Sequence, residues 1–392
     1  MEFGLTRVAE SSVRGRKALK DSLVAPHVLS RLDEPHLLST SHFLKRSPGG
    51  MRASKLLVAV AALAVSHALP LPDDDAVGVV WQFENTTWIE NLAVRGNGEI
   101  LCTSLSAGAI FMVNPFAHTV SANGAACRDD AKTSQEVTVH QFEAGNGVLG
   151  IAEIENDVFI VVTSQINLAT SVASPGSAAA WRVDMGAWTL GDDQPVTLIA
   201  NLTDVGLPDG VVALSEPGAV LVADAAKGLI WKLDTTNGKY DVIIQDDIFL
   251  SSSPQIPLGV DGLHIVDDYL YFTNLGDNIL CRVSIDAAGN ATDQIELVAT
   301  MPAPDDFALA EDGTAYVVGA NQLYRVSLAG NVDVLAGGFN DTTLEGATSA
   351  QFGRTREDAG VLYIGTNGGL LVPTNGRLIG GQILAINVDT FV

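Results

Sequence analysis

Residues 88–95 read Trp-Ile-Glu-Asn-Leu-Ala-Val-Arg, and the pattern that they begin recurs along the chain. An acidic residue and an amide precede a short apolar strand. A Gly-containing turn at 96–98 leads to a second apolar strand at 100–103, and a turn of small residues at 104–108 leads to a third strand at 109–113. Short apolar strands that alternate with tight turns predict an antiparallel β-meander.

Five further segments share this order of an acidic or Gly-containing opening followed by strand, turn and strand. Units of roughly 40–60 residues with three or four antiparallel strands are typical of propeller blades. We therefore predict an all-β fold, a six-bladed β-propeller with four-stranded antiparallel blades, in preference to a pair of β-sandwiches. The strand 78–83 belongs to no unit and is expected to pair with the sixth blade and close the ring. The six units open at Glu90-Asn91-Leu92, Leu149-Gly150-Ile151, Pro208-Asp209-Gly210, Val260-Asp261-Gly262, Pro304-Asp305-Asp306 and Leu344-Glu345-Gly346.

Composition and an N-terminal signal indicate the setting of the chain. It has 392 residues, 47% hydrophobic and 17% charged, and a net charge of −24, which excludes nucleic acid as a favoured partner because phosphates need basic contacts. Residues 51–68 combine a cationic start, an apolar run at 56–65 and small residues at 66–68, the pattern of a secretory signal peptide. The run is too short to span a bilayer. We predict a non-native or disordered leader at 1–50, a signal peptide at 51–68 and a secreted or secretory-lumen propeller domain at 69–392.

Cysteines and sequons agree with secretion. Cys102 and Cys127 are close enough in sequence to form a disulfide, whereas Cys281 lies in an apolar strand and is expected to be a buried thiol. Four Asn-X-Thr sequons predict N-glycosylation at Asn85, Asn201, Asn290 and Asn340.

Two rings of polar residues are expected around the propeller axis. Because neighbouring strands are antiparallel, the start of each innermost strand and the end of the second strand lie on the same face. Loops at 115–147, 165–180 and 367–381, with Trp88, are expected to form an apolar lid over this polar mouth, a common pocket design. The first ring is Glu90, Leu149, Asp209, Asp261, Asp305 and Glu345, and the second is Ser104, Gln165, Asp224, Asn274, Asn321 and Asn367.

The carboxylates of the first ring allow two interpretations. An Asp-Gly pair at a strand start is a turn device in which the carboxylate accepts backbone N–H groups. Alternatively, converging carboxylates are relieved by raised pKa values, by hydrogen bonds or by a hard cation such as Ca²⁺. If a divalent cation binds, its predicted ligands are Glu90, Asp209, Asp261 and Asp305; otherwise we expect no cofactor. The sequence contains no Gly-x-Ser-x-Gly or His-Glu-x-x-His motif.

The unit pattern resembles the gluconolactonase and regucalcin-like propellers, which hold a divalent metal on the channel with one Glu, two Asn and one Asp. Glu90 matches the family's Glu, and the Asp-Gly pairs match at Asp209 and Asp261, but no Asn stands at the equivalent strand starts. The signal peptide, the stretch 88–95, the segment Gly259-Val260-Asp261-Gly262-Leu263 and the sequons are more similar to the secreted fungal hetero-Diels–Alderase-like propellers of tropolone-sesquiterpenoid biosynthesis. This likeness covers about residues 70–392.

The second resemblance implies an enzyme without a cofactor that adds a tropolone quinone methide to an alkene of a humulene-type sesquiterpene, two apolar small molecules. A metal-dependent lactone hydrolase and a non-catalytic secreted binding propeller are the alternatives. A carboxyl group would assist dehydration as an acid, and amides would donate hydrogen bonds to the tropolone oxygens. The expected catalytic residues are Glu90, Asn91, Gln165, Asp261, Asn274 and Asn367. The expected substrate contacts are Trp88, Ser104, Asp209, Asp224, His264, Asn321 and Ser349.

Overall fold

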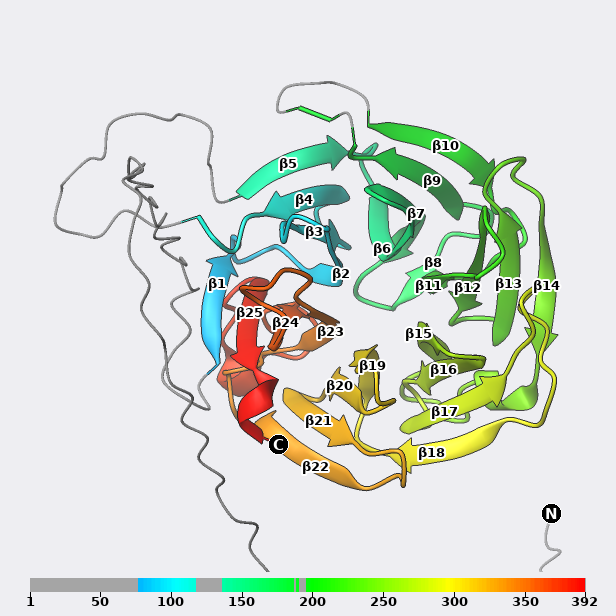
Figure 1. Ribbon diagram of the computed structural model, residues 1–392. Helices are drawn as coiled ribbons and strands as arrows, with labels where there is room; N and C mark the ends of the chain where they lie inside the picture. The colour runs from blue at the N-terminus through cyan, green and yellow to red at the C-terminus, as the bar shows by residue number, and fades with distance from the viewer. Residues whose placement is uncertain (1–76, 118–135, 187, 190–194, 392) are drawn as a thin grey trace, which may run out of the picture. The chain divides into compact units, whose positions relative to one another are not determined.

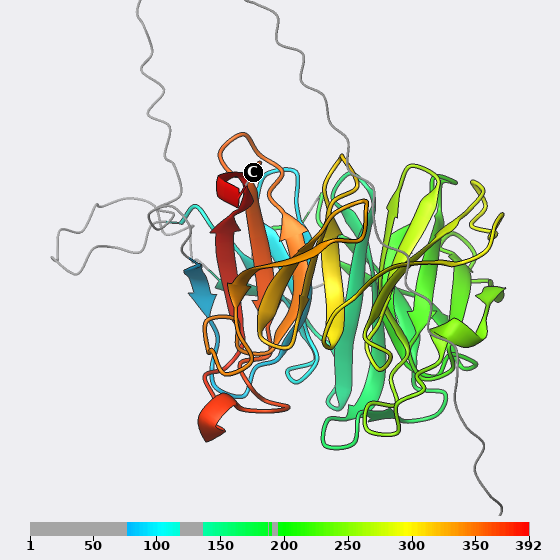
Figure 2. The same cartoon turned by 90° about the horizontal axis from the view of Figure 1, so that it is seen from below.

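Six antiparallel sheets surround a central axis as the blades of a propeller (Figure 1). The computed structural model describes residues 77–117, 136–186, 188–189 and 195–391, so the predicted leader, the signal peptide and Cys127 lie outside the described residues. Seen from the side, the strands run between two faces that carry the connecting loops (Figure 2). The prediction of a six-bladed, all-β propeller is confirmed.

Each blade is a meander whose first strand lies nearest the axis. The first three blades consist of β2 (Ile89–Val94), β3 (Ile100–Ser104), β4 (Ala109–Val113) and β5 (Glu136–Gln141); β6 (Asn146–Glu155), β7 (Val158–Asn167), β9 (Ala179–Asp184) and β10 (Val196–Asn201), with β8 (Val172–Ala173) paired to β7; and β11 (Pro208–Ala213), β12 (Ala219–Asp224), β13 (Leu229–Asp234) and β14 (Tyr240–Gln245). The next two consist of β15 (Val260–Val266), β16 (Tyr269–Asn274), β17 (Ile279–Ser284) and β18 (Glu296–Thr300); and β19 (Pro304–Leu309), β20 (Ala315–Gly319), β21 (Gln322–Val326) and β22 (Val332–Gly337).

The sixth blade is built from both ends of the described chain, as expected from strand 78–83. It contains β23 (Ala347–Phe352), β24 (Val361–Thr366), β25 (Gln382–Asn387) and, outermost, β1 (Gly78–Gln82). β1 pairs antiparallel with β25, and Nε2 of Gln382 donates to Oε1 of Gln82 at 2.6 Å. Figure 1 shows this closure as the blue strand beside the red one. Short 3₁₀ turns occupy 247–249, 374–376 and 388–391.

The core lies between adjacent blades. All six residues of β12 and all six of β24 are buried, whereas Val332, Asp333 and Val334 of the outermost strand β22 are exposed. One buried apolar cluster joins Leu92 of the first blade to Tyr363 and Ile383 of the sixth. The blades are therefore held together by apolar faces, at about 25 cal/mol for each Å² removed from water.

A β-bulge interrupts every innermost strand near its start, so two consecutive residues of each strand reach the axis. By register, the first axial ring is Glu90, Leu149, Asp209, Asp261, Asp305 and Thr348. The second axial ring is Asn91, Gly150, Gly210, Gly262, Asp306 and Ser349. The predicted start of the sixth unit was wrong by three residues, because Glu345 lies in the turn before β23 and Ala347 pairs with Thr366.

Glycines fill the second axial ring where the strands approach each other most closely. A Cβ on Gly150 would lie 2.1 Å from the carbonyl oxygen of Asp209, and one on Gly210 would lie 2.3 Å from that of Asp261. These contacts are with backbone atoms of the next blade, so a side chain can be accommodated only if the strands move apart.

We predict that Gly150→Ala destabilises the protein by about 1–3 kcal/mol, the usual cost of forcing extra volume into a packed interior. Gly96→Ala is the matched control, since a Cβ there meets no atom within 4 Å. Urea unfolding followed by tryptophan fluorescence gives the midpoint of each variant. Equal midpoints for the two variants would show that the axis is loosely packed.

Candidate functional site

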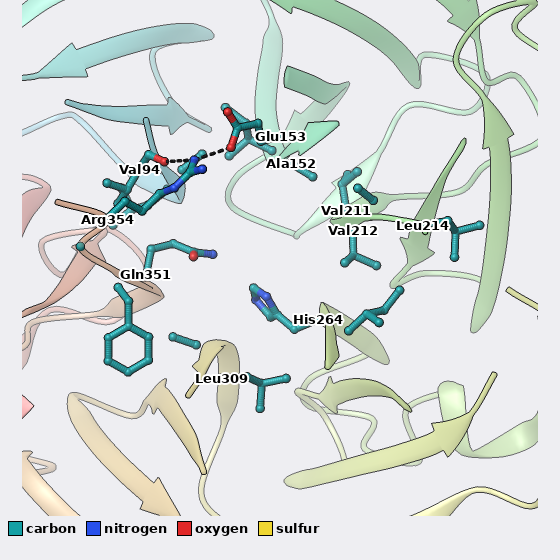
Figure 3. Close-up of a pocket in the computed structure, with 18 of the residues that line it drawn as sticks. Val94, Ala152, Glu153, Val211, Val212, Leu214, His264, Leu309, Gln351 and Arg354 are labelled. Carbon is teal, nitrogen blue, oxygen red and sulfur yellow. Dashed lines mark hydrogen bonds and ion pairs between the residues drawn. The ribbon is translucent and has the colours of Figure 1, made fainter. Parts of the chain in front are cut away.

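A pocket of about 650 Å³ lies on the propeller axis and is lined by all six innermost strands (Figure 3). This volume is within the range of roughly 300–1,000 Å³ that is usual for small-molecule sites. The lining residues follow the two axial rings in sequence, so the pocket lies toward the ends of the strands, away from the predicted mouth. Most of its lining residues are Leu, Val, Ile and Ala, but side chains such as Leu92 and Ile151 are buried between the blades, so polar and apolar atoms share the pocket surface about equally; His264 and Gln351 point toward its interior.

An ion-pair network holds one side of this pocket. Nη1 of Arg354, which follows β23, donates to the carbonyl oxygen of Val94 at 2.9 Å and to a carboxylate oxygen of Glu153 (Figure 3). The other oxygen of Glu153 accepts from the backbone N–H of Asp157, whose carboxylate binds Arg95 with two hydrogen bonds of 2.9 and 2.6 Å. The network joins the sixth, first and second blades and fixes the pocket rim, because bidentate Arg–carboxylate pairs are geometrically specific.

Three side chains bridge the axis at the floor of the pocket. Nδ2 of Asn91 donates to Oδ2 of Asp306 at 2.9 Å, and Nε2 of His264 lies 2.9 Å from Oδ1 of the same carboxylate. The backbone N–H of Phe307 also donates to Oδ1, at 2.8 Å. This axial bridge, formed by Asn91, Asp306 and His264, joins the first, fifth and fourth blades. Ser349 of the same ring is fully buried, and its Oγ has no hydrogen-bond partner among the described residues.

The carboxyl groups of the first axial ring are strongly perturbed. Burial raises the pKa of Glu90 from 4.5 to about 8, and the negative charges of Asp261 and Asp306 add to the effect, while the indole of Trp88 opposes it. Burial also raises the pKa values of Asp209, Asp261 and Asp305 well above their usual range, and repulsion between these carboxyl groups acts in the same direction. Burial and like charge both favour the protonated form, so these groups are suited to giving up or holding protons.

Apolar side chains cover this ring. Leu168, Leu258 and Leu370 pack against a buried cluster that contains Trp88, Leu105 and Leu149. Leu168 and Leu370 come from two of the three insertions that were expected to form a lid, and residues 118–135 of the third lie outside the described residues. The apolar cover explains why burial dominates the pKa shifts of the carboxyl groups.

The side chains of the second predicted ring form hydrogen bonds with the backbone of nearby loops, although they were expected to donate to a ligand. Both N–H groups of the Asn274 amide are used, by the carbonyl oxygens of Ile248 and Leu250. Asp224 accepts from the backbone N–H groups of residues 206, 207 and 227, and Ser104 donates to the carbonyl oxygen of Trp88. Oxygens of Asn321 and Asn367 accept from Gly346 and Gly369, whereas the Gln165 side chain is exposed.

Cys102 is a fully buried thiol that packs between the first and sixth blades; Cys127 lies outside the described residues, so its disulfide with Cys102 stays a prediction. Of the predicted catalytic and substrate-binding residues, His264 alone lines the pocket described above. Cys281 is a buried thiol, as expected.

Sequence reasoning missed Asp306, Gln351 and Arg354. Asp306 had a detectable signal, since it stands where three of the aligned units have Gly.

Metal binding on the axis stays a conditional prediction. They contain no group of three His, Cys, Asp or Glu side chains placed to hold a metal ion. Of the four conditional ligands, Asp209 and Asp261 are buried and Glu90 and Asp305 are half-buried, and burial raises the pKa of all four carboxyl groups. We therefore derive no chemical step through a metal.

Two further expectations concern glycosylation and membrane spans. The side chains of Asn85, Asn201, Asn290 and Asn340 are all exposed, and their glycosylation stays a prediction. No helix among the described residues has the length and apolar character needed to cross a membrane.

Comparison with known proteins confirms the resemblance. No protein-family model matches the chain. The chain is 28% identical over 333 residues to a Phoma protein named “Putative hetero-Diels-Alderase”, covering 77% of this chain and 88% of that protein. A Sarocladium schorii protein with the same description is 28% identical over 357 residues, covering 82% and 85%. Among solved structures, a gluconolactonase of Xanthomonas campestris has a TM-score of 0.52 at 12% identity, covering 82% and 91%, which supports the fold.

The raised pKa of Glu90 predicts a pH-dependent stability. Between about pH 4.5 and pH 8 the folded state holds a proton on Glu90 that the unfolded state has lost. The resulting stabilisation is fully present below pH 4.5 and disappears as the pH rises through 8, and Asp209, Asp261 and Asp305 act in the same direction. We expect the melting temperature to fall from pH 5 to pH 9, and to fall less in Glu90→Gln, which cannot ionise. Glu311→Gln, at an exposed residue, is the control. An unchanged slope in Glu90→Gln would contradict this assignment.

Proposed function

We propose that this protein is a cofactor-independent hetero-Diels–Alderase that joins a tropolone quinone methide to a humulene-type sesquiterpene in the axial pocket. The observation that carries the proposal is the pocket itself: a cavity of small-molecule size lined by all six blades, with mixed polar and apolar surface, His264 on the floor and Gln351 beside it. The names of the two relatives support the reaction class. We also propose, from the signal-peptide pattern at 51–68, that the reaction takes place in the secretory pathway or outside the cell.

The chemistry requires two contributions from the protein. Holding both reactants in one cavity replaces a bimolecular encounter by a reaction between fixed partners, and well-oriented intramolecular reactions reach effective molarities of about 10⁵–10⁸ M. A hydrogen bond to the oxygen of the heterodiene withdraws electron density and favours attack by the electron-rich alkene. Neither contribution needs a nucleophile or a cofactor.

The polar groups of the pocket are placed for this second contribution. The amide of Gln351 points into the pocket from β23, and His264 points into it from β15 (Figure 3). Arg354 is held at the rim by Val94 and Glu153, so its position does not depend on a ligand. These polar groups would orient the tropolone oxygens and leave the remaining volume for the hydrocarbon partner.

The test uses purified protein, a hydroxymethyl tropolone that dehydrates to the quinone methide, and a humulene-type alkene. We expect faster formation of adduct than in buffer and one predominant stereoisomer by chiral chromatography. Gln351→Leu should slow the reaction about tenfold, which corresponds to the loss of one hydrogen bond worth about 1.4 kcal/mol in the transition state.

The control is Val334→Ala, at an exposed residue of the outermost strand β22, which should react as the wild type does. Adduct formed at the buffer rate with racemic composition would refute the proposal. Ligand binding without turnover would instead support the non-catalytic binding propeller.

A further inference from the structure

We infer that His264 and Asp306 form a proton-accepting dyad on the floor of the axial pocket. In this dyad His264 takes the proton of an acidic hydroxyl on the bound ligand, and Asp306 positions the imidazole. The inference rests on the proposed function for its substrate, a tropolone. It assigns the acid–base role to a pair that includes Asp306, a residue absent from the predicted site, in place of Glu90 and Asp261.

The environment of Asp306 is that of a carboxylate anion. Oδ2 accepts from Nδ2 of Asn91 at 2.9 Å and Oδ1 accepts from the backbone N–H of Phe307 at 2.8 Å, and Oδ1 also lies 2.9 Å from Nε2 of His264. Asn91 Nδ2 and the backbone N–H can only donate, so each oxygen of Asp306 already accepts one fixed hydrogen bond, which favours the carboxylate and leaves His264 as its third donor. The side chain is 6% exposed, so these protein donors take the place of water.

The geometry of the bridge also selects the tautomer of His264. Because Asp306 accepts, Nε2 of the neutral imidazole carries the hydrogen and Nδ1 carries the lone pair. The ring is held from the side by Phe307, with centroids 4.6 Å apart and an interplanar angle of 67°. His264 lines the pocket and its side chain keeps 20% of its exposure, so Nδ1 is the ring nitrogen available to a ligand.

The proton transfer balances without another reactant. The ligand O–H bond breaks, its electron pair stays on the ligand oxygen, and the proton moves to Nδ1, giving an imidazolium that is paired with Asp306. When the hydroxymethyl group of the ligand loses its hydroxyl, the imidazolium returns the proton to that oxygen. Water leaves, the quinone methide forms, and the dyad is restored.

Other charged groups surround this dyad. Glu153, Asp267 and Arg354 line the same pocket, and the charges of Glu153 and Arg354 are paired with each other. The carboxyl groups Glu90, Asp209, Asp261 and Asp305 belong to the first axial ring, which precedes the bridge residues in each strand and lies away from the pocket. Asp306 is the carboxylate within hydrogen-bond distance of His264.

Tropolone itself is the probe, because its neutral and anionic forms have different absorption spectra. The spectrum is recorded during titration with full-length protein, at a pH where free tropolone is mainly neutral. Wild type should give the spectrum of bound anion. His264→Gln should give only the neutral spectrum and bind about tenfold more weakly, the effect of one lost charge-assisted hydrogen bond. Leu297→Ala, at an exposed residue of β18, is the matched control and should behave as the wild type does.

The double variant Asn91→Asp/Asp306→Asn tests whether the negative charge beside His264 matters apart from the hydrogen-bond geometry. It keeps an amide–carboxylate bond across the axis and leaves His264 an amide oxygen as acceptor, but moves the negative charge away from the imidazole. We expect a fraction of anion between those of the wild type and His264→Gln, with an unchanged unfolding midpoint.

If the exchange variant binds the same fraction of tropolone anion as the wild type, the role of Asp306 is overturned. If His264→Gln binds that same fraction of anion, the whole dyad is overturned. If the exchange variant does not fold, the spectrum of tropolone bound to His264→Gln still tests the dyad. An anionic spectrum without adduct formation would leave the dyad standing and refute the proposed reaction. Adduct formation in a protein that binds only neutral tropolone would support the proposed reaction and refute the dyad.

Discussion

The close approach of six innermost strands at the axis is the constraint on which the rest of the structure depends. Where two neighbouring backbones almost touch, only Gly fits, as at residues 150 and 210. Three blades carry polar side chains in the second axial ring, and two of these side chains, Asn91 and Asp306, bond to each other across the axis. Gly262 belongs to the same arrangement, because a Cβ there would lie 2.3 Å from Oδ1 of Asp306. The glycines thus make room for the polar bridge that forms the floor of the pocket.

The axial bridge divides the channel into two chemical environments. On one side, protonatable carboxyl groups lie under an apolar cover, and burial together with mutual repulsion raises their pKa values. On the other side, an accessible pocket has a mixed polar and apolar surface and a few oriented polar groups. An uncompensated buried charge costs several kcal/mol, so protonation is the inexpensive way to keep four carboxyl groups so close together. A ligand in the pocket meets His264 and Gln351 before any member of the acidic ring.

Strand periodicity and turn chemistry were sufficient to predict the blades, their number and the closure by strand 78–83. The same strand–turn–strand pattern occurs in each unit, so the number of units gives the number of blades. The site was harder to predict. A bulge near the start of every innermost strand changes which residues face the axis, and in the sixth unit the acidic Glu345 obscured the true positions of Thr348 and Ser349. Polar residues at strand ends were read as ligand donors, yet Asn274 serves the backbone of the preceding loop. Sequence spacing shows neither a bulge register nor the partner of an amide, since both depend on contacts between blades.

The pairing of β1 with β25 has a consequence for how the molecule is made. The sixth blade gains its outer strand from residues 78–82, which leave the ribosome about 300 residues before β25. Throughout that interval the early strand has no partner, and the nascent propeller is an open arc with an unpaired edge. Because this contact joins sequence-distant segments, loop closure makes it an expensive and slow step of folding. Blades one to five can assemble in order of synthesis, whereas the sixth blade is completed only after translation ends.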